Sequence, residues 1–385
     1  MTSLSALRSV FTAAVFTVYP LLAVFGAEVG PVVAISGTGG QAAVPSAVID
    51  STGVLHIVWA DGGSGKFDIF YRPVKNGLTG AIRQISDTPG LSSGPKLVTT
   101  PKGAVHVVWH DSTPPRTRLY GRGINPKSPM AILTTSTKGA FTPAISTDPE
   151  ERLHVAWADK SSGNFDIHYG LVGSDGTISS PQNLSSNSGK SLVPALATDS
   201  CGSVYVAWHD NSSGKFDVYL RVSRDHGATF GPLLNVSSSP GLSGAPTLAT
   251  GACGVLYVLW PDSSPGNFEI MARRSTDHGT SFLQSRNLSA TAELSIRPTV
   301  KLGSDANLHL IWIDGKPDHF DVYYRCVDRK LEGVSKPIQV SSGKGIAGAP
   351  TMDVAPDGTG HVAWIDNDSG PFRVFTRTIR NCSLK

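Results

Sequence analysis

The chain has 385 residues, of which 41 are glycine, 26 are proline and 16% are charged. This composition favours short strands separated by tight turns and excludes a fold built from long amphipathic helices. The formal net charge of +3 is small for this length, and the lysines and arginines are scattered, so nucleic acid is excluded as a partner.

The N-terminal segment differs from the rest of the chain. One arginine precedes an apolar stretch, and no acidic residue occurs before Glu28. This pattern, ending in the small residue Gly26, is typical of a secretory signal peptide. Pro20 and the short apolar region argue against a retained membrane anchor. We therefore expect a signal peptide over 1–26, one domain without a membrane span over 27–385, and a secreted, periplasmic or cell-surface protein.

From about residue 30 onward the chain repeats one unit seven times. In each unit a proline is followed fourteen positions later by a tryptophan, and an aspartate follows two positions after that. The series is Pro45/Trp59/Asp61, Pro95/Trp109/Asp111, Pro143/Trp157/Asp159, Pro194/Trp208/Asp210, Pro246/Trp260/Asp262, Pro298/Trp312/Asp314 and Pro350/Trp364/Asp366. A period of 48 to 52 residues marks an array of identical supersecondary units.

Each unit contains four short strand patterns, A to D in chain order. The second, as in residues 54–59 and 255–260, is almost entirely apolar and must be covered on both faces. Sheets stacked radially provide that cover. The sequence therefore predicts an all-β, seven-bladed β-propeller of four-stranded antiparallel blades.

The two ends of the chain indicate how the ring closes. The last unit stops after Arg377 without a fourth strand, whereas residues 31–37 match the fourth strand of the sixth unit, residues 337–342. We expect the N-terminal strand to be the outer strand of the seventh blade, so that the ring has no open face.

Side chains repeated in every unit are predicted to be structural. The tryptophans should pack between sheets, and the aspartates after them should accept backbone N–H bonds in the loop between strands B and C. A histidine or tyrosine three positions before each tryptophan should be a hydrogen-bonded core residue. The arginines thirteen positions after the tryptophans are predicted to form strand-edge ion pairs: Arg72, Arg122, Arg221, Arg273, Arg325 and Arg377.

Four cysteines occur late in the chain. Cys201 and Cys253 occupy equivalent turns of neighbouring units, and Cys326 and Cys382 lie near equivalent strand ends. Two disulfides between these pairs are one of three possible connectivities, and free thiols are the alternative. None of the spacings fits a metal site.

We expect no cofactor, with calcium as the alternative. In five units a second acid follows the Ser/Gly loop, and two carboxylates framing a loop can hold calcium. Lys66 or Lys215 could neutralise one acid instead. The second acids are Asp68, Asp166, Asp217, Glu269 and Asp321.

Between strands C and D, units four and five carry Ser-Arg-Asp-His-Gly-Ala-Thr-Phe and Ser-Thr-Asp-His-Gly-Thr-Ser-Phe. These segments resemble the Asp-box, Ser-x-Asp-x-Gly-x-Thr-aromatic, of sialidase-like (BNR-repeat) propellers, and the whole pattern is similar to exported bacterial propellers of that superfamily. The matching residues are Ser223, Asp225, Gly227, Thr229 and Phe230, and Ser275, Asp277, Gly279 and Phe282, with Ser281 where threonine is usual.

The resemblance implies the fold rather than catalysis. In that family the Asp-box is a folding device on the face opposite the active site. A sialidase needs three arginines, a tyrosine nucleophile with a glutamate partner, and an acid/base aspartate. The usual Arg-Ile-Pro motif is absent; the nearest string is Ile296-Arg297-Pro298, and Glu293 is the only nearby glutamate.

A single ligand must break the sevenfold pattern, so candidate site residues are those that depart from it on the face bearing the B–C and D–A loops. They are Arg116, Arg118, His110, His209, Arg297, Asp318 and His319. Arginines can hold an anionic sugar or a peptide carboxylate by bidentate bonds. The loops are short, which suits a flat recognition surface.

We therefore predict an exported, monomeric, non-catalytic binding or scaffold propeller that recognises a glycan or a protein on its loop face. The alternatives are a sialidase-like glycoside hydrolase acting on anionic sugars and a lectin with several equivalent sites between blades.

Overall fold

The computed structural model describes residues 27–385 except 38, 179, 342, 369, 383 and 385. The predicted signal peptide lies outside the described residues. The described part of the chain consists of strands, turns and loops and contains no helix. It accordingly has no helix that is long and apolar enough to span a membrane.

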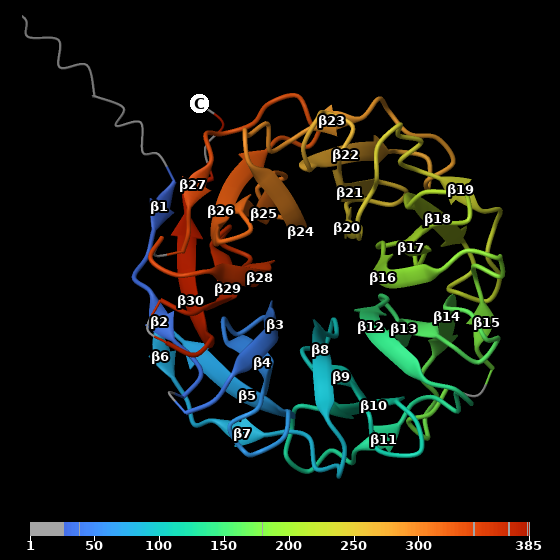
Figure 1. The fold of residues 1–385 in the computed structure, drawn as a ribbon, viewed down its shortest axis with the longest axis vertical. Coiled ribbons are helices and arrows are strands. Elements are labelled where there is room, and N and C mark those ends of the chain that lie inside the picture. The colour runs from blue at the N-terminus through green and yellow to red at the C-terminus, as the bar shows by residue number, and fades with distance from the viewer. Residues whose placement is uncertain are drawn as a thin grey trace, which may run out of the picture.

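Seven antiparallel sheets are arranged in a ring, which confirms the seven-bladed β-propeller (Figure 1). Blades 1 to 3 contain β3 (Ala42–Ile49), β4 (Leu55–Asp61), β5 (Asp68–Lys75), β6 (Leu78–Thr79) and β7 (Arg83–Gln84); β8 (Ser92–Thr99), β9 (Val105–Asp111), β10 (Arg118–Gly123) and β11 (Ala131–Ile132); and β12 (Ala140–Thr147), β13 (Leu153–Asp159), β14 (Asp166–Leu171) and β15 (Gln182–Asn183).

Blades 4 to 7 follow the same order. They contain β16 (Ser191–Thr198), β17 (Val204–Asp210), β18 (Asp217–Ser223) and β19 (Leu234–Asn235); β20 (Thr247–Thr250), β21 (Leu256–Asp262), β22 (Glu269–Ser275) and β23 (Arg286–Asn287); β24 (Leu294–Leu302), β25 (Leu308–Lys316), β26 (His319–Val327) and β27 (Ile338–Gln339); and β28 (Ala347–Val354), β29 (Gly360–Asp366) and β30 (Arg373–Arg380).

The N-terminal segment closes the ring, as predicted. β1 (Glu28–Val29) and β2 (Val33–Ala34) both pair antiparallel with β30. Ile35, which follows β2, is fully buried against blades 7 and 1. The seventh sheet therefore combines the two ends of the chain.

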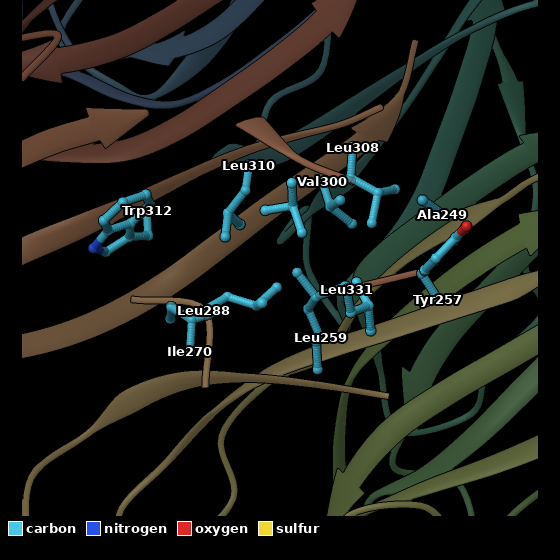
Figure 2. Close-up of a cluster of buried hydrophobic side chains, with 12 residues drawn as sticks. Ala249, Tyr257, Leu259, Ile270, Leu288, Val300, Leu308, Leu310, Trp312 and Leu331 are labelled. Carbon is cyan, nitrogen blue, oxygen red and sulfur yellow. The ribbon is translucent and has the colours of Figure 1, made fainter. Parts of the chain in front are cut away.

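The cores of the propeller lie between blades. Seven buried hydrophobic clusters occur in the described residues, one at each contact between neighbouring blades. Figure 2 shows the cluster of blades 5 and 6, where Trp312 lies beside Leu310 and Ile270 beside Leu288. All seven tryptophans are at most 1% exposed, which confirms their predicted packing role.

The loops after the tryptophans also follow the prediction, with one exception. In six blades the aspartate two positions after the tryptophan accepts a backbone N–H two residues further on, as Asp159 does from Ser161 at 2.8 Å. In blade 6 the corresponding Asp314 instead accepts the hydroxyls of Thr291 and Ser295, and the loop is a tight β25–β26 hairpin.

The prediction of ion pairs for the repeated arginines is wrong. Five of these guanidinium groups donate to a backbone carbonyl just after the outer strand of the preceding blade. Arg221 Nε, for example, donates to Leu184 O at 2.7 Å. The carbonyls at the end of each outer strand have no further strand to pair with, so a guanidinium supplies their donor. The five are Arg72, Arg122, Arg221, Arg325 and Arg377.

The structure decides among the cysteine pairings that the sequence left open, and two disulfides join the equivalent positions. Cys201–Cys253 joins blades 4 and 5, and Cys326–Cys382 joins β26 to the C-terminal segment. Disulfides of this kind persist in oxidising compartments.

Because neighbouring strands are antiparallel, the connections fall on two faces. The B–C and D–A connections form one face, here called the loop face, and the A–B and C–D connections form the other, here called the turn face.

Candidate functional site

The two arginines predicted in blade 2 do not form a clamp. Arg116 Nη1 donates to the carbonyls of Ser136 and Thr137 at 3.2 and 3.3 Å, so this guanidinium fastens the B–C loop to the following D–A loop. Arg118 opens β10, paired in register with Asp111, and its side chain is half-buried. Arg116 is therefore largely committed to holding loop structure.

His110 and His209, which directly follow their tryptophans, are half-buried packing residues with an unused nitrogen. The His110 ring lies 6.3 Å from Phe141 of the next blade, and the His209 ring lies 4.9 Å from Phe216. In both, Nδ1 is buried without a hydrogen-bond partner among the described residues. Burial lowers the pKa of both imidazoles, so they are neutral at neutral pH.

Asp318 and His319 lie at the tip of the blade 6 hairpin. Both are exposed, and His319 Nε2 lies 3.2 Å from Asp321 Oδ2. Beside them, Lys316 Nζ pairs with Glu293 at 3.5 Å. Lys316 and His319 of the hairpin thus each face a carboxylate of the same blade.

The inner strands carry a bulge that governs which side chains reach the axis. The register of strands A and B shifts next to the repeated proline in six blades, and the residue before that proline has a positive φ there. A bulge redirects the side chains next to it. The residues before the proline are Val44, Gly94, Thr142, Val193, Ala245, Arg297 and Ala349, so Arg297 is the only charged one.

The position after the same proline also has a single charged residue, Lys96 of blade 2. β8 and β24, which carry Lys96 and Arg297, lie on opposite sides of the central axis (Figure 1). Both side chains are exposed, and neither forms an ion pair with a described carboxylate. By contrast Lys301, near the C-terminal end of β24, pairs with Asp353 at 3.3 Å.

The blades around the axis surround Lys96 and partly desolvate its ammonium group, although the side chain remains exposed to solvent along the axis. This desolvation is the main cause of a lowered pKa at Lys96, and the positive charge of Arg297 lowers the pKa further. Arg297 was predicted from the sequence, whereas Lys96 was not, because its only signal is a single charge at a position that is otherwise occupied by small residues. We call Lys96 and Arg297 the axial pair.

Every described tyrosine lies on a strand rather than in a loop of the loop face. In two of the five units the second acid is paired with a lysine: Lys66 binds Asp68 and Lys215 binds Asp217, and serine hydroxyls donate to both carboxylates. In these two loops the lysine occupies an oxygen that calcium would use.

The Asp-box residues take the roles that the resemblance implied. Asp225 accepts the Ser223 and Thr229 hydroxyls at 2.6 and 2.5 Å and the Thr229 N–H at 2.8 Å, and Phe230 packs edge-on against Tyr169 of blade 3. In the second box, Asp277 makes the same bonds to Ser275 and Ser281.

No protein-family model and no curated protein matches this chain. Solved structures do match it. A protein of unknown function from Dyadobacter fermentans aligns with a TM-score of 0.59 and 15% identity over 92% of this chain and 99% of that chain. An ulvan lyase bound to -[GlcA(1-4)Rha3S]- aligns with a TM-score of 0.62 and 10% identity over 87% and 93%.

An α-L-arabinanase from Penicillium chrysogenum, complexed with arabinobiose, aligns with a TM-score of 0.54 and 14% identity over 89% of this chain and 94% of that chain. At such identities the likeness concerns the fold. The chain accordingly shares its β-propeller fold with these proteins.

Proposed function

We propose that this protein is an exported, monomeric and non-catalytic recognition propeller whose loop face receives an anionic glycan, and that this glycan reaches the axial pair on the inner strands. Export is supported by the signal-peptide pattern of residues 1–26 and by the two disulfides.

The axial pair is the observation that carries the proposal. Lys96 and Arg297 are two positive charges on the inner strands, the charge of Arg297 lowers the pKa of Lys96, and neither group forms an ion pair with a described carboxylate. Like charges in a partly desolvated place repel, and an anion bound between them relieves the repulsion. A guanidinium and an ammonium group together suit a carboxylate or a sulfate on a sugar.

A binding role is favoured over hydrolysis because the loop face offers no assembled nucleophile and acid. The described tyrosines lie on strands, and Glu293 is paired with Lys316. Fold neighbours include proteins solved with carbohydrate, which is consistent with a glycan as the ligand.

The test is calorimetric titration with oligogalacturonate, a sulfated dextran oligosaccharide and neutral dextran. We expect the anionic oligosaccharides to bind, with an affinity that falls as salt rises. Lys96→Ala and Arg297→Ala should each weaken binding about tenfold, equal to about 1.4 kcal/mol. Lys190→Ala, an exposed lysine on a D–A loop, is the matched control.

Two outcomes would overturn the proposal. Equal binding of neutral dextran would remove the role of charge, and unchanged affinity in both axial variants would place the ligand elsewhere. Release of reducing ends or unsaturated products from either anionic oligosaccharide would replace the binding role by that of a hydrolase or lyase.

A further inference from the structure

In blades 4 and 5 the histidine of the Asp-box fills a place on the turn face. His226 covers Gly202 of its own A–B turn, and His278 covers Gly254 in the same way: a Cβ on these glycines would come within 2.1 and 2.9 Å of the ring. Both glycines have a positive φ, so no side chain of the turn itself occupies this place.

Each of these imidazoles also faces an aspartate of the preceding blade. His226 Nδ1 lies 3.7 Å from Asp148 Oδ2, and His278 Nδ1 lies 3.7 Å from Asp199 Oδ2. The repeat thus has a defined seat for one planar ring, between a turn glycine and the carboxylate of the neighbouring blade.

Blades 1 and 2 form the same seat without the ring. Gly103 is the turn glycine and Asp50 is the preceding carboxylate, but the C–D loop of blade 2, residues 124–130, has no Asp-box. A Cβ on Gly103 would meet only Ser51 Oγ, at 3.7 Å. A cavity of about 490 Å³ lies here, lined by both residues and by His56, Arg83, His106 and Asn125.

The polar groups of the cavity are partly unused. His56 uses both ring nitrogens: Nε2 lies 3.0 Å from Asp50 Oδ2, and Nδ1 lies 2.9 Å from Tyr71 OH. His106, the equivalent of His56 in blade 2, makes no hydrogen bond to a described residue, because Thr100 and Gly121 stand where blade 1 has Asp50 and Tyr71.

Arg83 completes the wall. Its guanidinium lies 4.7 Å from the centre of the Tyr71 ring, and Nη2 donates to Ile124 O at 3.1 Å. The opposite charges of Arg83 and Asp50 balance within the cavity, and desolvation lowers the pKa of His106, so this imidazole is neutral and offers one donor and one acceptor.

We infer that the cavity between blades 1 and 2 binds one neutral sugar ring of a glycan. The ring lies on the Gly103 turn, where other blades place an imidazole; its hydroxyls donate to Asp50 Oδ2 and accept from Arg83 and His106. Balanced charge and mixed donors and acceptors suit hydroxyl groups better than an anion. This site is on the turn face and does not depend on the proposed axial site.

The experiment follows the imidazole signals of ¹³C-labelled histidine while methyl glycosides of neutral hexoses and pentoses are added one at a time. At least one glycoside should shift the His106 and His56 signals in a saturable manner. Ala104→Trp should abolish the shift, because Ala104 is exposed and lines the cavity, so the indole blocks it without disturbing the core.

Asn307→Trp, at the equivalent turn position of blade 6, is the matched control and should retain the shift. Arg297→Ala should retain it as well, while weakening binding of oligogalacturonate, which separates this site from the axial one. The inference is overturned if no glycoside shifts these signals, if the shift survives Ala104→Trp, or if imidazole or oligogalacturonate binds the cavity and no neutral glycoside does.

Discussion

Blades 2 and 4 resemble each other on the loop face and differ on the turn face. On the loop face both have a histidine after the tryptophan, and in both the indole Nε1, of Trp109 and Trp208, has no hydrogen-bond partner among the described residues. On the turn face blade 4 has a disulfide and an Asp-box, whose His226 fills the place beside Gly202; blade 2 has neither, and the equivalent place beside Gly103 is open. The two ends of one blade therefore diverge independently, and the proposed sugar site lies where the place beside the turn glycine is unfilled.

The largest expected effect concerns the disulfide that blade 2 lacks. Replacing Cys201 and Cys253 by serine releases a loop of 52 residues, and chain entropy predicts a loss of about 4 kcal/mol in the free energy of unfolding. Guanidinium unfolding of the double variant measures it. The Cys326→Ser/Cys382→Ser variant should lose the same free energy on going from its oxidised to its reduced form, and a loss well below 1 kcal/mol would contradict the account.

The tryptophans provide a smaller and sharper comparison. Trp157 Nε1 donates to Asp159 Oδ2 at 2.9 Å, whereas Trp109 Nε1 has no partner among the described residues. Trp157→Phe should therefore destabilise the protein by about 1–2 kcal/mol more than Trp109→Phe, because only the former removes a bond to a buried carboxylate. Denaturant titrations of the two variants measure this difference. Equal losses of unfolding free energy would show that the Trp157–Asp159 hydrogen bond contributes nothing to stability.

The histidines shared by blades 2 and 4 predict a pH dependence. Burial lowers the pKa of His110 and His209, so the unfolded chain binds more protons at these positions than the folded protein. Stability should then fall as the pH drops below about 6.5, the pKa of an exposed histidine. The His110→Gln/His209→Gln variant should lose less stability than wild type between pH 7 and 5; an identical slope would argue against neutral buried rings.

The Asp-box gives the smallest effect, because it is exposed. Hydrogen bonds from Ser223 and Thr229 lower the pKa of Asp225 to about 2. The stabilisation that the Asp225 carboxylate provides is therefore complete above about pH 3.9, the pKa of an unperturbed aspartate, and is lost as the pH falls through about 2. Asp225→Asn should flatten the stability profile between pH 4 and 2 relative to wild type. Thermal unfolding at each pH measures this, with Asp318→Asn as an exposed control.

Much of the fold was predictable because each blade packs on its neighbours through the same positions. The tryptophan period gave the number of blades, and the match of residues 31–37 to a D strand gave the ring closure. The arginines thirteen positions after the tryptophans were misassigned because sequence reveals the repetition of a donor but not its acceptor, which is a carbonyl on another blade. Arg116 was offered as a ligand residue for the same reason.

Sequence alone determined what repeats: seven sheets, their buried indoles, the Asp-box turns and the strand shared by the two termini. These features depend on spacing along the chain, and spacing is written in the sequence. Only the tertiary structure decided which exceptions meet. Lys96 and Arg297 lie on strands of opposite blades and still influence each other electrostatically, and Gly103 and Asp50 of neighbouring blades line one cavity, because closing the ring joins positions that no local pattern relates.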